Sequence, residues 1–322
     1  MTIEHARASA LPKPWGIFDL RPWSNACHEG GPIGEIWYER SSPEAAESSL
    51  LLKILFTNQP LSIQVHPADA FAHSIGLPCG KTEAWYVLRA APEAKVALGL
   101  NQRLTPQQLR AAVDDGSISN LVVWQAVSSG DAIFVPAGTI HAIGAGLVIA
   151  EIQQRSDATF RLFDYGRQRG LHVENAVAAA DAGPAHVQGR PIRLTDERTL
   201  LISSPYFVVE RIELPPNSTW RLDGERETWF LVLNGDARTK SFDMTTGDAL
   251  FVQSDSVRLH TGPAGLVGLV AYTGEVPVPI LLRRARQPGA IDHRPRHATR
   301  APPLVPRAKT TTSTNERLEL SQ

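Results

Sequence analysis

The chain has 322 residues, of which 43% are hydrophobic and 20% are charged. This composition is ordinary for a folded globular chain, and it excludes wholesale disorder, a collagen-like fibre and a coiled coil. The formal net charge is −1, so the overall charge does not favour binding to nucleic acid or to a membrane surface.

The charge is distributed unevenly along the chain. From Arg283 to Gln322, nine Lys and Arg residues oppose three Asp and Glu residues, which gives this segment +6 and leaves −7 on residues 1–282. The segment 283–322 is rich in Arg, Pro and Thr and poor in large apolar residues. We therefore predict a basic, disordered tail that follows an acidic folded body.

Cysteine content and apolar runs bear on the compartment. Cys27 and Cys79 are the two cysteines of the chain, so no disulfide framework is indicated and a reducing compartment is favoured. The N-terminal residues contain no apolar stretch typical of a signal peptide, and no apolar run approaches the ~18 residues that a membrane helix needs. We expect a cytoplasmic protein without a membrane or nucleic-acid partner.

Short apolar runs separated by Gly and Pro predict many strands. The predicted strands are Gly34–Tyr38, Leu50–Phe56, Leu61–Val65, Ala84–Leu88, Ala132–Val135 and Leu147–Ile152. Helix signals are confined to two places. One lies in an insertion near 104–125, where Thr105-Pro106 resembles an N-cap followed by Pro in the first turn, and Gly116 ends the pattern. The other is the alanine-rich segment Val173–Ala180.

An internal echo indicates that one β unit occurs twice. Lys81–Leu88 resembles Arg226–Leu233, and each segment is followed by a Gly-Asp-Ala-apolar-Phe-Val strand, at Gly130–Val135 and at Gly247–Val252. We predict a mainly β fold of two β-barrels with short helical insertions. The predicted domains are residues 1–182 and 183–282, followed by the tail 283–322.

The first candidate metal ligands lie on the strand Leu61–Val65 and just after it. Side chains alternate along a strand, so Gln64 and His66 point to the same face and supply two convergent ligands. A hydrogen-bonded Gln followed by a surface His before Pro67 is the simpler interpretation of these residues taken alone.

A second motif favours the metal interpretation. Gly130, Pro136, Gly138 and His141 have the spacing G-x5-P-x-G-x2-H, which resembles the cupins, small jelly-roll β-barrels. The resemblance implies that both predicted barrels are of the cupin type and that His141 enters the mouth of the first. In the second copy Gln253, Asp255 and Arg258 replace Pro136, Gly138 and His141, so that barrel is predicted to be degenerate.

The order of the motifs resembles one cupin family in particular, the short bacterial form of the type I phosphomannose isomerases. The matching segments are Trp15-Gly16, Ile33–Trp37, Gln64–Pro67, Gly80–Trp85, Pro136–Gly144 and Glu151–Asp157. The resemblance implies Gln64, His66, Glu83 and His141 as the ligands of one zinc ion per chain. Two nitrogen and two oxygen ligands suit zinc and do not exclude manganese, iron or cobalt.

The resemblance also implies an activity, the interconversion of mannose 6-phosphate and fructose 6-phosphate through an enediolate. Such a reaction needs an acid–base group and cations that stabilise developing negative charge. Arg161 matches the family's active-site arginine and suits a phosphate or enediolate oxygen. Lys81 matches a family position that binds substrate oxygen or shuttles a proton. Glu151 is predicted as general acid–base, with the orientation of Arg161 or of a ligand as its alternative role.

Other interpretations stay open at this stage. The same fold could act on another sugar or sugar phosphate, or it could be a non-catalytic, sugar-binding regulatory protein with two cupin barrels. Asp157 is a weaker site candidate, and His73 is interpreted as a solvated loop residue rather than a fifth ligand. The expected partner is a small sugar phosphate, and the expected oligomeric state is a monomer or a homodimer.

Overall fold

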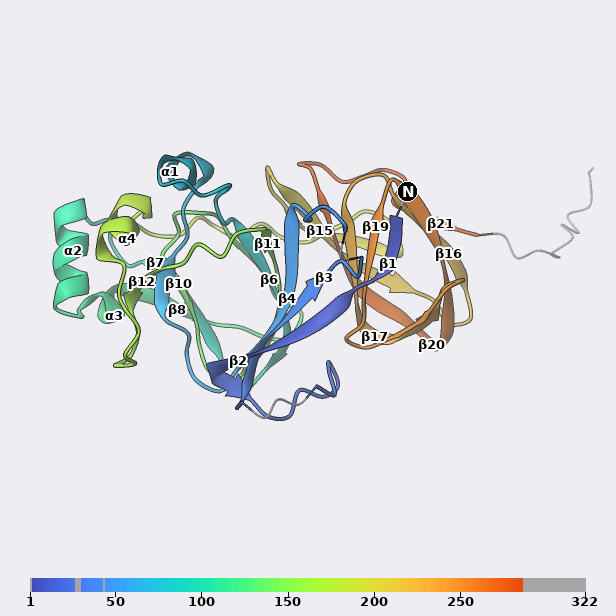
Figure 1. Cartoon of the computed structure of the whole chain (residues 1–322), viewed down its shortest axis with the longest axis horizontal. Helices are drawn as coiled ribbons and strands as arrows, with labels where there is room; N and C mark the ends of the chain where they lie inside the picture. The colour runs from blue at the N-terminus through green and yellow to red at the C-terminus, as the bar shows by residue number, and fades with distance from the viewer. Residues whose placement is uncertain (1, 27–29, 43, 286–322) are drawn as a thin grey trace, which may run out of the picture. The chain divides into compact units, whose positions relative to one another are not determined.

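The strands of the described chain form three antiparallel sheets (Figure 1). The structure is a computed structural model that describes residues 2–26, 30–42 and 44–285. Its mainly β architecture with short helices confirms the predicted fold class. Each strand predicted from the apolar runs is present, with boundaries that differ by a few residues.

Two of the sheets belong to the N-terminal half. The six-stranded sheet has the order β2 (Arg7–Ile17), β3 (Ile33–Glu39), β4 (Leu50–Thr57), β11 (Leu147–Gln154), β6 (Glu83–Ala90) and β9 (Ala132–Val135). The five-stranded sheet has the order β12 (Phe160–Phe163), β5 (Ile63–Val65), β10 (His141–Ile143), β7 (Lys95–Leu100) and β8 (Val122–Ala126).

The third sheet has ten strands and contains the C-terminal half. Its main path is β1 (Thr2–His5), β19 (Ala249–Gln253), β17 (Thr228–Arg238), β20 (Asp255–Thr273), β15 (Phe207–Leu214), β14 (Arg198–Ser203) and β13 (Ile192–Arg193). Branches are formed by β16 (Thr219–Gly224), β18 (Asp243–Thr245) and β21 (Leu282–Arg284).

The helices of the described chain are α1 (Asp69–Ser74), α2 (Pro106–Asp114), α3 (Ile118–Leu121) and α4 (Val173–Ala179). The two predicted helices are confirmed as α2 and α4. Thr105 caps α2 by accepting a hydrogen bond from the Gln108 amide, and the Gln108 side chain reaches back to the Thr105 amide, which completes a capping box. Apolar residues of α2 and α4 share one core with β5, β10 and β12 of the five-stranded sheet.

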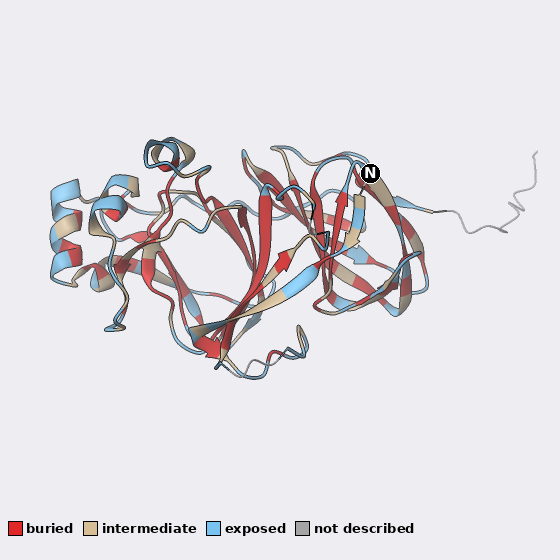
Figure 2. Ribbon diagram, viewed as in Figure 1, coloured by how far each residue is buried: buried red, intermediate tan, exposed pale blue. Residues whose placement is uncertain are grey.

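The six-stranded sheet is apolar on both faces, and every residue of β4 and β11 is buried (Figure 2). One face packs toward the five-stranded sheet around Trp85 and Ile149. The other face packs against the ten-stranded sheet around Trp229 and Phe251. A sheet covered on both sides needs near-continuous apolar strands, and the sequence of β4 meets that requirement with a single internal charge, Lys53.

The pairing register confirms the internal echo. In the first copy Glu83 lies opposite Val135, and in the second copy Thr228 lies opposite Val252. The offset matches that of the predicted repeat, so Thr228 occupies the position of Glu83. Arg258, at the position of His141, is exposed on β20. The second copy therefore lacks both of these side chains, in agreement with its predicted degeneracy.

The predicted domain limits are only partly reflected in the strand pairing. Residues 1–286 form one compact unit, and β1, within the predicted first domain, pairs with β19 of the C-terminal sheet. The predicted tail begins at Arg283, but Arg283 and Arg284 belong to β21, which pairs with β16. Residues 286–322 of the tail lie outside the described residues, as does Cys27, while Cys79 is a free cysteine.

In the part of the chain that the structure covers, no helix has the length and apolar character required to span a bilayer.

The two halves are also joined by a buried carboxylate. Glu227 accepts hydrogen bonds from the amides of Ser49, at 2.6 Å, and Leu50, at 2.8 Å, which belong to the N-terminal half. Leu50 is buried, so removing the acceptor leaves its N–H without a partner.

We predict that Glu227→Ala lowers the free energy of unfolding by at least about 2–3 kcal/mol, because the buried Leu50 amide and the buried Trp229 indole N–H both lose their acceptor. Urea denaturation measures this change. Glu225→Ala is the matched control, since Glu225 is exposed, and its change should stay within about 0.5 kcal/mol. Equal effects of the two substitutions would contradict the prediction.

Candidate metal centre and active site

Strand pairing brings three of the predicted site residues into one row. In the order β12–β5–β10, Gln64 lies opposite Arg161 on one side and opposite His141 on the other. Directly opposed residues of an antiparallel pair project to the same face. The row therefore places a guanidinium, an amide and an imidazole side by side, although the three residues are spread over about a hundred positions of the sequence.

Three predicted ligands form a compact, buried cluster. His66, Glu83 and His141 each offer a ligand atom, and these atoms all lie within 4.8 Å of one another. The Nε2 atom of His66 is 3.4 Å from Glu83 Oε2, and the Nε2 atom of His141 is 3.5 Å from Glu83 Oε1. Each of the three residues is 1% exposed. Such convergence of buried polar side chains is costly unless they share a partner.

Both imidazoles are held in the tautomer that a metal ligand requires. The Nδ1 atom of His66 is 2.8 Å from the carbonyl oxygen of Ala158, and that of His141 is 2.9 Å from the carbonyl oxygen of Thr139. A carbonyl only accepts, so each Nδ1 carries the hydrogen and each Nε2 presents its lone pair to the cluster. Burial, with the charge of Lys81, lowers the pKa of His66 to about 3, and burial also lowers the pKa of His141. Both rings are therefore neutral.

Glu83 is the anionic member of the cluster. Burial acts to raise its pKa, but the positive charge of Lys81 holds the pKa well below its ordinary value. The Oε1 atom accepts a hydrogen bond from Trp85 Nε1 at 3.1 Å. The Oε2 atom is buried and has no hydrogen bond of good geometry from the described residues, although the Lys81 ammonium forms an ion pair with it at 3.1 Å. A buried carboxylate oxygen with a free lone pair is suited to coordinate a cation.

Gln64 reaches the cluster through the nitrogen of its amide. Its Nε2 atom is 3.3 Å from His141 Nε2, and its Oε1 atom accepts a hydrogen bond from Ser62 Oγ at 2.9 Å. Ligation through oxygen requires the amide to turn over, after which its nitrogen can donate to the Ser62 hydroxyl. The donor set of two neutral imidazoles, one carboxylate and this amide fits a divalent cation such as zinc.

A cavity of about 380 Å³ adjoins the cluster and contains Lys81, Glu151 and Arg161 in its lining. The structure thus brings together all the catalytic and substrate-binding residues predicted from the sequence. The weaker candidate Asp157 also lines the cavity. His73 does not; it is an exposed residue of α1 whose Nε2 is 3.0 Å from the Pro78 carbonyl oxygen.

Lys81 is a buried cation between the cluster and the cavity. Its ammonium lies 3.1 Å from Glu83 Oε2 and 3.1 Å from His66 Nε2. Burial acts to lower its pKa, but the negative charges of Glu83 and Glu151 outweigh burial and raise it. Lys81 therefore stays protonated and is a donor to an oxygen in the cavity.

Glu151 is a buried carboxyl group suited to proton exchange. Its Oε2 atom accepts from Trp85 Nε1 at 3.2 Å, and its Oε1 atom is 3.5 Å from the Lys53 ammonium. Burial and the charge of Glu83 raise its pKa, against the opposing effect of Lys81 and Lys53. A carboxyl group with a raised pKa can both take up and release a proton near neutral pH.

Arg161 lines the cavity and forms no ion pair with any of the described residues. It donates to the Gly170 carbonyl oxygen at 3.4 Å, and its buried Nε has no hydrogen-bond partner in the described chain. Burial and the neighbouring charge of Arg169 lower its pKa. Arg169 also lines the cavity, but it is engaged by Asp164, with Nε 2.7 Å from Oδ2. A guanidinium with free donors beside a second one is a site for an anion.

Sequence reasoning did not single out several residues of this cavity: Lys13, Glu35, Lys53, Arg169 and His172. Lys53 had a signal, because a lysine in the middle of a fully apolar strand must have a buried partner. Glu35 belongs to a segment that matched the family, yet no role was derived for it. Arg169 and His172 gave no local signal, since only the path of the chain after β12 brings them to the cavity.

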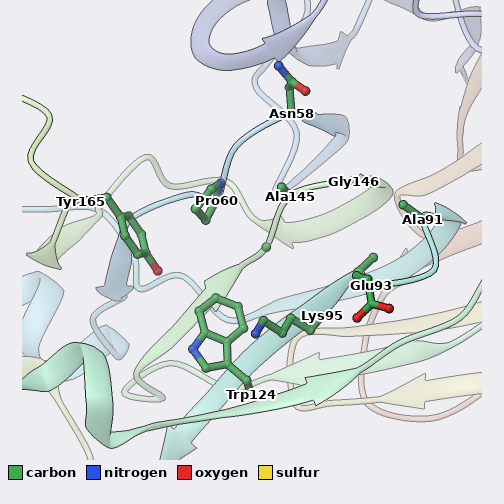
Figure 3. A pocket seen from close by; sticks show the side chains of 11 residues that line it. Asn58, Pro60, Ala91, Glu93, Lys95, Trp124, Ala145, Gly146 and Tyr165 are labelled. Atoms are coloured by element: carbon green, nitrogen blue, oxygen red, sulfur yellow. The ribbon is translucent and has the colours of Figure 1, made fainter.

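A larger hollow of about 630 Å³ lies elsewhere on the N-terminal half (Figure 3). Its lining includes Trp124, Lys95, Glu93 and Tyr165, together with the small residues Gly144–Gly146. None of Gln64, Lys81, Glu151 and Arg161 lines this larger hollow, whereas all four line the smaller cavity. The smaller cavity is therefore the candidate active site.

No family model matches the chain. It is 36% identical over 202 residues to a mannose-6-phosphate isomerase of Streptococcus mutans, a match that covers 59% of this chain and 64% of that protein. It is also 36% identical over 220 residues to a mannose-6-phosphate isomerase of Bacillus subtilis, covering 62% of this chain and 65% of that protein. The chain thus spans slightly less than two thirds of the length of these curated relatives.

The fold is similar to solved structures. The crystal structure of a mannose 6-phosphate isomerase from Bacillus subtilis superimposes with a TM-score of 0.73 at 22% identity, covering 84% of this chain and 100% of that one. The apo form of the enzyme from Salmonella typhimurium gives a TM-score of 0.65 at 15% identity. The resemblance of this chain to the type I phosphomannose isomerases is therefore confirmed, in sequence over about three fifths of its length and in fold over most of it.

Proposed function

We propose that this chain is a metal-dependent aldose–ketose isomerase that interconverts mannose 6-phosphate and fructose 6-phosphate. The observation that carries the proposal is the composition of one cavity. It borders the His66–Glu83–His141 cluster through Gln64 and Lys81, and it is lined by a carboxyl group with a raised pKa and by an arginine whose buried Nε has no hydrogen-bond partner in the described chain. The names of the sequence relatives support the same activity.

His66, Glu83, His141 and, through its amide oxygen, Gln64 would hold one zinc ion. When bound, the cation would polarise the oxygens of the open-chain sugar and stabilise the negative charge that develops on them. Lys81 would donate a hydrogen bond to a sugar oxygen from its buried ammonium. It also neutralises part of the charge of Glu83, so that the cluster carries no uncompensated anion before a ligand binds.

Glu151 would transfer the proton between the two adjacent carbons. Isomerisation removes a proton from one carbon and returns a proton to its neighbour, so a single carboxyl group can act first as base and then as acid. Trp85 fixes this carboxyl group, because its indole N–H lies 3.2 Å from Glu151 Oε2 and 3.1 Å from Glu83 Oε1. The indole N–H of Trp85 therefore fixes the distance between Glu83 of the metal cluster and Glu151.

The phosphate would bind to Arg161, with Arg169 adding a second positive charge. A dianionic ester must enter a folded body that carries −7 over residues 1–282, so the attraction has to be local. The oligomeric state, the cytoplasmic location and zinc as the natural ion stay predictions of the sequence, as do the absence of a nucleic-acid partner and of a membrane partner.

A coupled assay of the purified chain tests the proposal directly. Mannose 6-phosphate should give fructose 6-phosphate, the rate should disappear with a chelator, and zinc should restore it. Mannose and other aldose phosphates are assayed in parallel. Turnover of another sugar alone would support the isomerase of different specificity, and zinc binding with no turnover of any sugar would support the non-catalytic binding protein.

The metal and phosphate roles are separated by two substitutions. We predict that His141→Ala raises the dissociation constant for zinc at least about 100-fold, since a direct ligand is lost. Arg161→Ala should leave zinc affinity unchanged and lower kcat/KM about 100-fold or more, because the phosphate loses its unpaired partner. Chelator competition and steady-state kinetics measure the two effects. His73→Ala is the control for the first substitution, and unchanged kinetics of Arg161→Ala would show that the phosphate assignment is wrong.

Lys53 should set the pH dependence of the reaction. Its positive charge lowers the pKa of Glu151, and Glu151 must be ionised to act as a base. Lys53→Met removes that charge, so the pKa of Glu151 rises and the acid limb of the kcat/KM profile moves to higher pH. Lys53→Arg keeps the charge and should leave the limb near its original position. A limb unmoved by Lys53→Met would exclude Glu151 as the group that titrates.

A further inference from the structure

Asp69 connects segments that lie far apart in the sequence. It is the first residue of α1, three positions after His66. Its Oδ1 atom accepts hydrogen bonds from the Gly80 amide at 2.7 Å and from Gln154 Nε2 at 3.0 Å. Its Oδ2 atom accepts a hydrogen bond from the hydroxyl of Tyr206 at 2.9 Å. The Asp69 carboxylate thus links four parts of the chain: the loop after His66, the loop before Glu83, the end of β11 and the C-terminal half.

The partners of Asp69 control the backbone on either side of the ligands. Gln154 accepts from the Thr82 amide through its side chain, at 2.9 Å, and donates its own amide to the Thr82 carbonyl oxygen, at 3.0 Å. The Lys81 amide donates to the Pro67 carbonyl oxygen at 2.9 Å. These bonds hold residues 81 and 82, immediately before Glu83, against the segment that immediately follows His66.

The backbone around Gly80 lies too close to the segment Pro67–Asp69 to accommodate a side chain. A methyl group at this position would lie 2.6 Å from the Pro67 carbonyl oxygen and 2.8 Å from the Asp69 amide nitrogen. The two segments therefore touch through their backbones, and the Asp69 bond to Gly80 fixes their separation. A displacement of Asp69 would be transmitted to the spacing between the His66 and Glu83 ligand atoms.

Tyr206 is contributed by the C-terminal half, one residue before β15. We propose that Tyr206 is a positioning residue of the metal centre, which acts through Asp69 to hold the two ligand-bearing loops at the separation that the cation needs. The proposal rests on the metal site described under the proposed function. It assigns the degenerate second copy of the repeat a role in metal affinity, although Thr228 and Arg258 stand in that copy at the positions of Glu83 and His141.

The test compares two tyrosines whose hydroxyl groups both join the halves. Tyr206→Phe should raise the dissociation constant for zinc about 5-fold, the effect of one ordinary hydrogen bond. It should also alter the visible absorption spectrum of the cobalt-substituted protein, which reports ligand geometry. Tyr38→Phe is the control, because the Tyr38 hydroxyl donates to the Gly247 carbonyl oxygen at 2.6 Å and does not contact the ligand loops. It should lower the free energy of unfolding and leave the zinc constant and the cobalt spectrum unchanged.

A double-mutant cycle locates the effect at Asp69. Asp69→Ala should weaken zinc binding more than Tyr206→Phe does, and Tyr206→Phe should add no further loss in the Asp69→Ala background. Additive losses, equal losses in the two tyrosine variants, or wild-type zinc affinity in Tyr206→Phe would each overturn the proposal. If the wild-type chain bound no zinc, the metal site of the proposed function would fail first, and this inference would fail with it.

Discussion

The site depends on one buried anion, the carboxylate of Glu83. An ionised carboxyl group without water is unfavourable by several kcal/mol unless positive charge and hydrogen bonds compensate it. Here the Lys81 ammonium lies 3.1 Å from Oε2, and the indole N–H of Trp85 donates to Oε1 at 3.1 Å. The same compensation continues outward, because Glu151 lies beside Lys53 and Glu35 lies beside Lys13. Acidic and basic side chains are therefore paired along the lining of the cavity beside the metal cluster.

The two barrels use one strand register for different purposes. In the first copy the interior position next to the strand end carries Glu83, and in the second copy it carries Thr228. The Thr228 hydroxyl donates a hydrogen bond to the Arg226 carbonyl oxygen at 2.9 Å. This side chain is uncharged, so it needs no cation to compensate it. The polar contribution of the second copy lies outside its barrel, where Glu227 and Tyr206 make hydrogen bonds to the first half. The two copies therefore share a strand pairing, but the second copy lacks the side chains that form the metal cluster.

Most of the fold and the metal cluster could be predicted because their signals are local. The Thr105 capping box, the apolar run of β4 and the Gly-Pro-Gly-His spacing before β10 each lie within a dozen residues. The place of Arg169 in the cavity and the Tyr206–Asp69 bond could not be predicted, since the first depends on the path of the chain after β12 and the second joins residues 137 positions apart. The orientation of the Gln64 amide is set by Ser62, and no sequence pattern encodes it.

The pairing of β1 with β19 has a consequence for how the chain is made. β1 is synthesised about 250 residues before its partner β19 (Ala249–Gln253), so it stays unpaired until that partner has been made. Until the two strands pair, the backbone donors and acceptors along the outer edge of β19 are exposed and can template pairing with another chain. The pairing of β1 with β19 therefore protects a sheet edge at which correct assembly and aggregation compete.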